Sequence, residues 1–377
     1  MNSKSPALAS RAFRGFALFG ALASLSLTAC SAGDAPMPTT QRRELVAANL
    51  APPARLIVDS LFNDRAAMGE TRALIVLRDG QPVYEAYADG FGPNSKLISW
   101  SMAKSVTSVL VGMLVADGRL VLDDPAPIPD WQRPGDPRGS ITLRHLLNMA
   151  SGLEHDEDGD PVWESDTVAM LFGAGAANMA GQAEDKPPVA APGEQFNYSS
   201  STSLILADII ARALTDSRVP VVRRDAVRNF IDGRLAGPLG MTSLTPEFDA
   251  SGTMIGGSIM HATARDFAKF GEFLRRRGET PDGARLVSEN WIAFMLSPSP
   301  ANPGYGGHIW LNRRQSGAEA GLWPDRGPPD LFACLGHQGQ YIIVSPREHM
   351  TVVRLGISTS AQNANVRDTL RRVMGAF

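Results

Sequence analysis

Residues 99–118 have the sequence SWSMAKSVTSVLVGMLVADG. Apolar side chains recur around most of the circumference of a helix here. This pattern predicts a buried helix over residues 101–116 that ends at the helix-stop pair Asp117-Gly118. Lys104 is the only charged residue within that predicted helix. Because a solvent-facing helix normally carries several charges, we expect Lys104 to point into a cleft.

Ser101 and Lys104 stand three residues apart, so a helix places them on the same face. A serine hydroxyl becomes a good nucleophile when a neutral amine beside it accepts its proton, and desolvation in a cleft favours that neutral amine. A position in the first turn of the helix also favours negative charge developing on Ser101. The pair therefore predicts a serine nucleophile with a lysine base. From these residues alone, the alternative is a polar stripe in which Lys104 forms a salt bridge.

Four further stretches carry recognisable motifs. They are residues 141–153 (ITLRHLLNMASGL), 192–200 (PGEQFNYSS), 254–271 (MIGGSIMHATARDFAKFG) and 336–340 (GHQGQ). Together with Ser101-x-x-Lys104 and in the same order, they resemble the class C β-lactamase and penicillin-binding-protein superfamily of serine hydrolases. The Tyr-Ser-Ser sequence at 198–200 and residues 254–271 look closest to the 6-aminohexanoate-dimer hydrolase (nylon-oligomer hydrolase) group.

This resemblance implies that Ser101 attacks a carbonyl carbon to form an acyl-enzyme, and that Lys104 accepts its proton. Tyr198 would hydrogen-bond Ser101 and relay a proton to the leaving group. Outside the motif, Tyr198 would be read as a half-buried structural tyrosine. The backbone N–H groups of Ser101 and Gln340 would form the oxyanion hole, in which one donor contributes about 2.7–4 kcal/mol.

By the same resemblance, Ser200, His337 and Gly339 are expected to bind substrate. His337 stands where many members have a lysine that holds a substrate carboxylate, and histidine is a weaker, pH-dependent cation. Ser200 stands where asparagine is usual. Both departures reduce the fit to β-lactams and D-Ala-D-Ala peptides and favour simpler esters or amides. The alternative for His337 is a strand-end histidine without a function.

An apolar run at residues 73–77, the turn pair Asp79-Gly80 and a second run at 83–87 predict a β-hairpin. Other predicted elements are strands at 307–311, 340–344 and 350–355, helices at 202–214 and 364–374, and a helix at 42–62 interrupted by Pro52 and Pro53.

Strands at both ends of the chain, with helices between them, predict an α+β fold, and the resemblance implies that this fold is of the β-lactamase type. An antiparallel sheet would be flanked by the terminal helices, with a mostly helical lobe inserted. The domain would span residues 42–377, with the sheet lobe at about 42–100 and 255–377 and the helical lobe at about 101–254. A cleft between two such lobes is a usual place for a small-molecule site.

Residues 1–29 have the features of an export signal. Three basic residues and no acidic ones precede an apolar run at residues 16–27, which is too short to span a membrane. The run closes with Leu-Thr-Ala-Cys, which resembles the bacterial lipoprotein signal. That resemblance implies lipidation of Cys30, a polar tether at residues 30–41, and a location in the bacterial cell envelope, on the outer membrane facing the periplasm. The alternative is an ordinary secretory signal cut just before Cys30.

Composition narrows the possible partners. The chain has 36 Lys and Arg against 39 Asp and Glu and no long basic run, so no nucleic-acid partner is expected. The histidines form no His-x-x-x-His pair, and neither a metal site nor a cofactor is expected. The acidic stretch 154–158 lies in an irregular region, residues 151–195, and is expected to be a solvated loop that could form part of a lid.

These features predict an exported serine hydrolase that cleaves amide or ester bonds of small substrates through an acyl-enzyme on Ser101. One alternative keeps this chemistry but assigns another substrate, as in a peptidoglycan D,D-peptidase or a β-lactamase. Another alternative is a catalytically silent envelope protein that uses the same cleft for binding.

Overall fold

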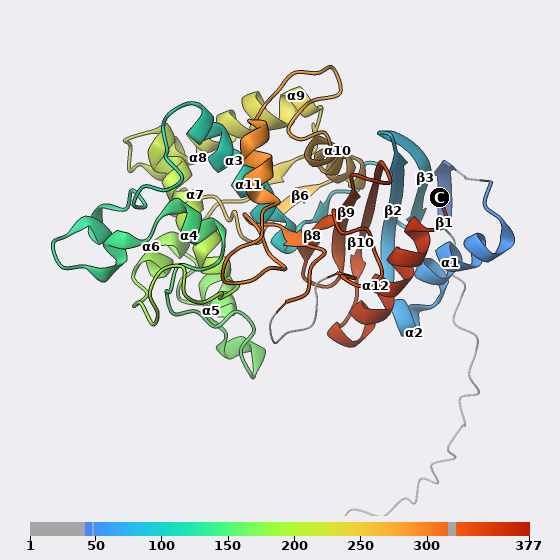
Figure 1. The fold of residues 1–377 in the computed structure, drawn as a ribbon, viewed down its shortest axis with the longest axis horizontal. Coiled ribbons are helices and arrows are strands. Elements are labelled where there is room, and N and C mark those ends of the chain that lie inside the picture. The colour runs from blue at the N-terminus through green and yellow to red at the C-terminus, as the bar shows by residue number, and fades with distance from the viewer. Residues whose placement is uncertain (1–41, 47–48, 316–321) are drawn as a thin grey trace, which may run out of the picture. The chain divides into compact units, whose positions relative to one another are not determined.

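The computed structural model describes residues 42–46, 49–315 and 322–377. Its largest element is a seven-stranded antiparallel sheet with the order β1-β3-β2-β10-β9-β8-β7 (Figure 1). Its strands are β1 (Arg42–Val46), β2 (Glu70–Arg78), β3 (Gln81–Ala88), β7 (Trp310–Leu311), β8 (Phe332–Gly336), β9 (Gln340–Ser345) and β10 (Met350–Ile357).

The predicted hairpin forms β2 and β3. Asp79 and Gly80 have φ values of 52° and 78°, the left-handed pair that a tight two-residue turn requires, and the turn pairs Arg78 with Gln81. Successive side chains of β2 point to opposite faces of the sheet. Leu74 and Val76 therefore enter a different apolar cluster from Ala73 and Ile75, which explains why this strand is apolar on both faces.

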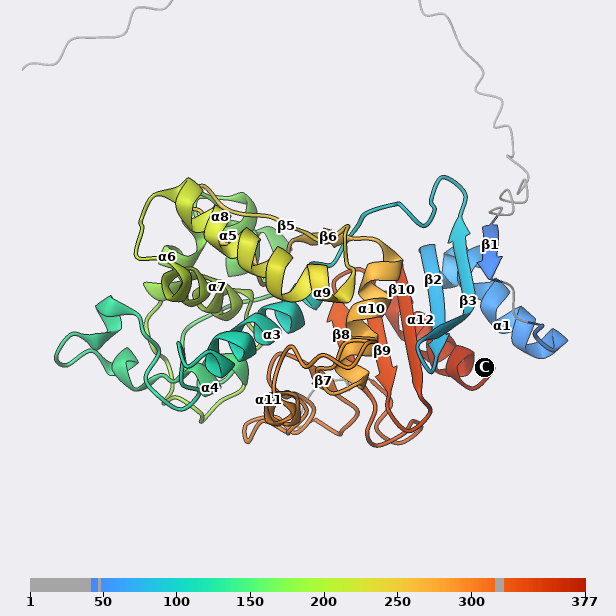
Figure 2. The ribbon, with the colours of Figure 1, turned by 90° about the horizontal axis from the view of Figure 1, so that it is seen from above.

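Helices cover both faces of the sheet. The terminal helices α1 (Pro52–Asn63) and α12 (Ser360–Met374) pack on one face, and α10 (Ala264–Arg275) packs on the other (Figure 2). Gly271 of α10 lies so close to β9 and β10 that a Cβ atom there would stand 2.6 Å from the Cγ2 atom of Thr351. The close approach of this helix to the sheet therefore requires a glycine.

A largely helical part lies between β3 and the later strands. Its helix α3 (Ala103–Ala116) is buried over twelve consecutive residues, as its apolar sequence predicts. The remaining helices are α2 (Arg65–Met68), α4 (Leu143–Leu147), α5 (Asp166–Phe172), α6 (Met179–Glu184), α7 (Ser200–Leu214), α8 (Pro220–Ile231), α9 (Gly237–Leu239) and α11 (Glu289–Met295). A small sheet of order β4-β6-β5 consists of β4 (Leu97–Ile98), β6 (Met260–Ala262) and β5 (Thr245–Pro246).

The predicted helix at residues 42–62 is only partly correct. Residues 42–46 form the edge strand β1, which pairs with β3, and the helix begins at Pro52. Proline at the first helical position needs no N–H partner, so Pro52 and Pro53 start this helix and do not interrupt it. Strand β8 was not predicted at all, and the predicted strand at 307–311 is confined to 310–311.

The predicted signal peptide (residues 1–29), Cys30 and the tether (residues 30–41) lie outside the described residues. Among the helices in the described part of the chain, none combines the length and apolar character needed to cross a bilayer.

Candidate active site

The predicted nucleophile lies at the entrance to α3. Ser101 belongs to a short 3₁₀ turn, η1 (Trp100–Met102), which leads directly into α3. Trp100 has φ 44°, a left-handed conformation that is costly for a residue with a side chain and is often found at functional sites. Lys104 is one turn further along and only 1% exposed. A hydrogen bond of 3.1 Å joins its Nζ atom to Ser101 Oγ.

Three acceptors surround the Lys104 amine. Besides Ser101, they are Ser200 Oγ at 2.9 Å and the carbonyl oxygen of Gly257 at 2.8 Å. Burial lowers the pKa of Lys104 to about 8, although the negative charge of Glu157 acts in the opposite direction. A buried amine with this pKa is neutral in a useful fraction of molecules near neutral pH, and it can then accept a proton from Ser101.

Tyr198 lies against the same amine. Lys104 Nζ is 4.8 Å from the centre of the Tyr198 ring. The ring also packs on Tyr305 and Trp310, with centroid distances of 5.9 and 5.4 Å, and these contacts hold it in place. Burial and the charge of Glu157 raise the pKa of Tyr198 well above its ordinary value, while a hydrogen bond with Ser101 lowers it. The phenol is therefore protonated and can donate a proton.

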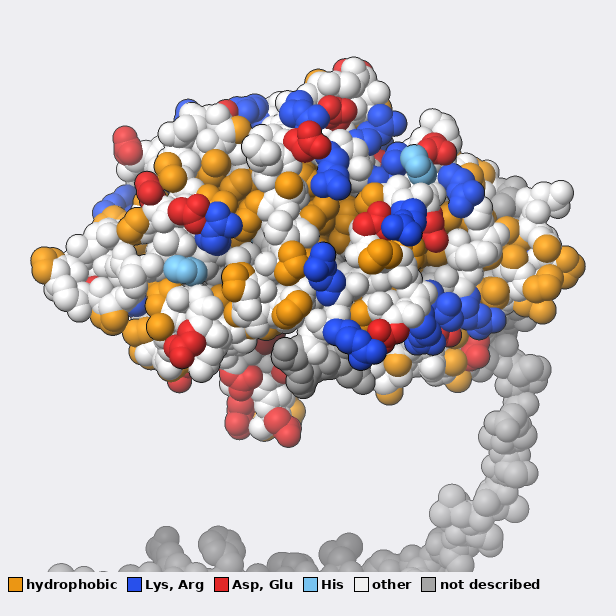
Figure 3. All heavy atoms as spheres, viewed as in Figure 1, with side chains coloured by type: hydrophobic (Ala, Val, Ile, Leu, Met, Phe, Trp, Pro, Cys, Tyr) orange, Lys and Arg blue, Asp and Glu red, His pale blue; other side chains and the backbone are white. Residues whose placement is uncertain are grey.

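Ser101 opens into a pocket of about 580 Å³. Its lining consists of Ser101, residues 155–158, Asn197, Tyr198, Trp310, Leu335, Gly336 and His337. None of these lining residues, all from the described part of the chain, is Lys or Arg. Figure 3 shows acidic side chains gathered over the segment that leads to α5 in Figure 1. The pocket wall therefore has no permanently positive side chain that could pair with a substrate carboxylate.

Glu157 is the residue that the sequence did not single out. The predicted solvated loop at residues 154–158 turns its alternate side chains inward, and the Glu157 side chain is 19% exposed. Its Oε1 atom accepts a hydrogen bond from Ser200 Oγ at 2.7 Å, and its Oε2 atom accepts one from the Ser200 N–H at 2.7 Å. Burial raises the pKa of Glu157, but the charge of Lys104 and the hydrogen bonds from His155 and Ser200 lower it to about 2. The Ser200 hydroxyl therefore lies between the Glu157 carboxylate and the Lys104 amine and contacts both.

The structure places the predicted substrate-binding residues in different surroundings. His337 lines the pocket, with its ring edge-on to Trp100 at 5.3 Å. Ser200 is buried behind Lys104. Gly339 lies in the turn between β8 and β9 at φ 80°, and its carbonyl accepts a hydrogen bond from Arg354. Ser200 and Gly339 therefore do not line the pocket.

Gln340 is also absent from the pocket lining. It is buried opposite Gly336 in the β8–β9 hairpin, and its side chain donates to the carbonyl oxygens of His337 at 3.0 Å and Gly356 at 2.6 Å. It thus stabilises the turn from behind. Two residues that do line the pocket, Ser101 and His337, have backbone N–H groups without a hydrogen-bond partner among the described residues.

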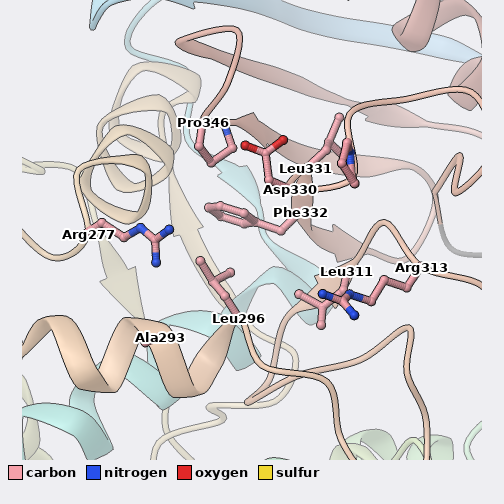
Figure 4. A pocket seen from close by; sticks show the side chains of 10 residues that line it. Arg277, Ala293, Leu296, Leu311, Arg313, Asp330, Leu331, Phe332 and Pro346 are labelled. Carbon is pink, nitrogen blue, oxygen red and sulfur yellow. The ribbon is translucent and has the colours of Figure 1, made fainter.

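A second hollow lies at Phe332, the first residue of β8 (Figure 4). Its lining includes Arg277, Leu296, Arg313 and Phe332 and contains none of the predicted site residues. In the described part of the chain, no group of three or more His, Cys, Asp and Glu side chains is placed to hold a metal ion. Of the predicted site residues, Ser101, Tyr198 and His337 line the Ser101 pocket, and Lys104 lies directly behind Ser101.

A protein-family model described as beta-lactamase matches residues 63–374. The chain belongs to the beta-lactamase family. It is 25% identical over 252 residues to a 6-aminohexanoate-dimer hydrolase of Paenarthrobacter ureafaciens. That match covers 60% of this chain and 57% of the relative, so the chain spans less than two thirds of the relative's length.

Solved structures of other proteins share the fold. A candidate 6-aminohexanoate-dimer hydrolase from Bacillus anthracis has a TM-score of 0.66 and 21% identity, covering 86% of this chain and 81% of that one. A D-alanine carboxypeptidase from Burkholderia cenocepacia has a TM-score of 0.59 and 16% identity, covering 86% and 98%. The predicted superfamily and the predicted α+β fold are thus confirmed, and the chain is a member of a family of hydrolases.

Proposed function

We propose that this family member is a serine hydrolase that cleaves amide or ester bonds of small substrates through an acyl-enzyme on Ser101. The observation that carries the proposal is the 3.1 Å hydrogen bond between Ser101 Oγ and the buried amine of Lys104, at the wall of an open pocket. A hydroxyl with a desolvated base beside it, at the start of a helix, is the arrangement that nucleophilic catalysis needs.

The chemistry follows from these contacts. Ser101 Oγ bonds to the carbonyl carbon, its proton passes to neutral Lys104, and the carbonyl oxygen takes the negative charge. When the tetrahedral adduct collapses, the bond to the leaving group breaks, Tyr198 delivers a proton to it, and the Lys104 ammonium gives its proton to Tyr198, so that both groups regain their starting state. Water then attacks the acyl carbon and loses a proton to Lys104, and this proton passes to Ser101 Oγ as the acyl bond breaks, which releases the acid and restores the Ser101 hydroxyl.

We place the oxyanion at the free backbone N–H groups of Ser101 and His337, both of which belong to pocket residues. This replaces the sequence-based choice of Gln340, whose side chain and backbone belong to the hairpin behind the pocket. Two such donors contribute about 2.7–4 kcal/mol each to stabilising the transition state.

The charge of the pocket favours neutral or amine-bearing substrates over carboxylates. Asp156 and Asp158 lie in its wall, and the position where many relatives have a lysine is occupied by His337. β-Lactams and peptidoglycan stem peptides carry a carboxylate, so they fit this wall poorly. The name of the relative from Paenarthrobacter ureafaciens supplies a linear amide as one class of substrate to test. The 6-aminohexanoate dimer has an amine on its acyl half and a carboxylate on its leaving group, so comparing it with uncharged linear amides tests this charge preference.

A substrate panel tests the proposal. It comprises p-nitrophenyl esters, short linear amides including the 6-aminohexanoate dimer, a D-Ala-D-Ala peptide and nitrocefin. We expect ester or linear-amide turnover with a kcat/KM at least about 100-fold above that for nitrocefin, a difference of roughly 2.7 kcal/mol. Faster turnover of nitrocefin or of the D-Ala-D-Ala peptide would favour the β-lactamase or D,D-peptidase alternative. Failure of Ser101 to react with a fluorophosphonate probe would favour a silent binding protein.

The pH dependence of turnover reports the base. Lys104 must be uncharged to accept the Ser101 proton, and burial lowers its pKa to about 8. Activity should therefore rise as pH increases, by about tenfold from pH 6 to pH 7, and level off above pH 8 to 9. A profile of kcat/KM from pH 5 to 10 measures this rise. Activity that is flat or falls over this range would contradict a lysine base with this pKa.

The start of the chain supports a further part of the proposal. We infer that the protein is exported and anchored through lipidated Cys30 to the bacterial outer membrane, facing the periplasm, with residues 30–41 as a tether. The support is the signal-like sequence of residues 1–29. Mass spectrometry of the purified protein should find diacylglyceryl-modified Cys30 at its N-terminus, and an unmodified residue there would contradict the anchor.

A further inference from the structure

We propose that Glu157 is a positioning residue that acts through Ser200 to aim the Lys104 amine at Ser101 and sets the pH above which that amine is uncharged. The inference rests on the proposed function, because it assigns a role toward the proposed nucleophile and base. It adds to the site a carboxylate from a loop that the sequence indicates as solvated.

Glu157 is held by four hydrogen-bond donors. Its Oε1 atom accepts from Ser200 Oγ. Its Oε2 atom accepts from the Ser200 N–H at 2.7 Å and from Thr167 Oγ1 at 2.9 Å, and it lies 2.7 Å from His155 Nε2. The Ser200 N–H belongs to the first turn of α7, where the helix dipole favours a negative charge. These contacts fix the carboxylate in its ionised form and in one place.

The ionised carboxylate decides the direction of each hydrogen bond that leads to Ser101. A carboxylate only accepts, so the Ser200 hydroxyl must donate its proton to Glu157 and can offer Lys104 only an acceptor. The carbonyl oxygen of Gly257 is also only an acceptor. A neutral amine has two N–H groups, which these two oxygens occupy. Its lone pair is then left for the third neighbour, Ser101, whose hydroxyl donates to it across 3.1 Å.

Other titratable groups lie around Glu157 and Lys104, on each segment that packs against these two residues. They are His155 and Asp158 from the same loop, Asp166 and Lys186 beside His155, and Tyr198 and His308 beside Lys104. Lys186 forms an ion pair with Asp166 at 2.6 Å. Burial lowers the pKa of His308 to about 3, so this ring is neutral. Glu157 is thus the carboxylate whose charge acts on Lys104.

The sign of the effect follows. The Glu157 charge stabilises the ammonium form of Lys104 and so raises the pH at which the amine becomes neutral. Removing that charge should shift the acidic limb of the activity profile to lower pH. It should also lower the plateau, because the Ser200 hydroxyl is then free to turn its proton toward Lys104 and compete with Ser101. A residue that only stabilised the loop would lower both stability and activity without moving the limb.

The test uses Glu157→Gln in the full chain and the rate at which a fluorophosphonate probe labels Ser101 from pH 5 to 10. We expect the acidic limb to move down by about 1–3 pH units, the range for a neighbouring opposite charge. We also expect the plateau rate to fall at least about tenfold, since positioned acid–base groups contribute about 10²–10⁴. An unmoved limb in a folded variant would overturn the inference.

Two further variants separate the effects. Ser200→Ala keeps the negative charge of Glu157 but removes the hydroxyl that connects it to Lys104. The acidic limb of its pH profile should therefore stay within about half a pH unit of the wild type, while its plateau labelling rate falls at least about tenfold. If Ser200→Ala labelled at the wild-type plateau rate, Glu157 would not act through Ser200. This result decides the question even if Glu157→Gln does not fold. Glu154→Gln removes an exposed carboxylate of the same loop and should match the wild type. Absence of labelling in the wild type would instead contradict the proposed function.

Discussion

Ser101→Ala should abolish turnover of every substrate that the wild type cleaves, lowering kcat by at least about 10⁴-fold. The loss is this large because the variant has no atom that can form the acyl bond, whereas the pocket and the oxyanion donors remain. Steady-state kinetics with the best p-nitrophenyl ester measures the change. The free energy of unfolding should fall by about 1–3 kcal/mol, since the hydrogen bonds of Ser101 with Lys104 and Tyr198 are lost.

Ser108→Ala is the matched control for this variant. Ser108 lies on α3, the helix that follows the turn holding Ser101, and donates to the carbonyl oxygen of Gly307 at 2.9 Å, away from the pocket lining. Its replacement should cost about 1 kcal/mol of stability and leave kcat within about twofold of the wild type. If Ser101→Ala kept wild-type turnover, Ser101 would not be the nucleophile and the proposed function would fail.

Lys104→Met should lower kcat by about 10²–10⁴-fold, the usual contribution of a positioned acid–base group. Methionine fills nearly the same buried volume but has no amine to receive the Ser101 proton. The residual activity should also lose the rise with pH that Lys104 produces in the wild type. A pH profile of kcat together with the melting temperature separates loss of the base from loss of the fold.

Lys96→Met provides the comparison. Lys96 is exposed, and its amine donates to Thr245 Oγ1 at 2.9 Å, outside the proposed site. Its replacement should leave both the rate and the pH profile unchanged. A Lys104→Met variant that kept its rate and its pH dependence would show that another group accepts the proton.

Elements governed by local interactions could be predicted from the sequence. The hairpin of β2 and β3 was correct because two short apolar runs and the Asp-Gly turn between them act over neighbouring residues. The strand β1 was not recognised because its pairing partner, β3, lies about forty residues away. The short strand β8 was missed for a different reason: it pairs with β9 across a three-residue turn, but its sequence FACLG includes Ala and Gly, which are uncommon in strands.

The candidate active site also combines features set by neighbouring residues with features set by contacts between distant segments. The i, i+3 spacing places Ser101 beside Lys104 within a single helical turn, so the sequence by itself determined that pair. Only the tertiary structure decided that Glu157 faces Lys104 and that Gln340 lies behind the pocket, which the predicted residue His337 does line. The physical reason is that these contacts depend on where a loop and a hairpin turn pack against α3. Such packing is set by burial and charge pairing between segments distant in the chain, which spacing along the sequence does not encode.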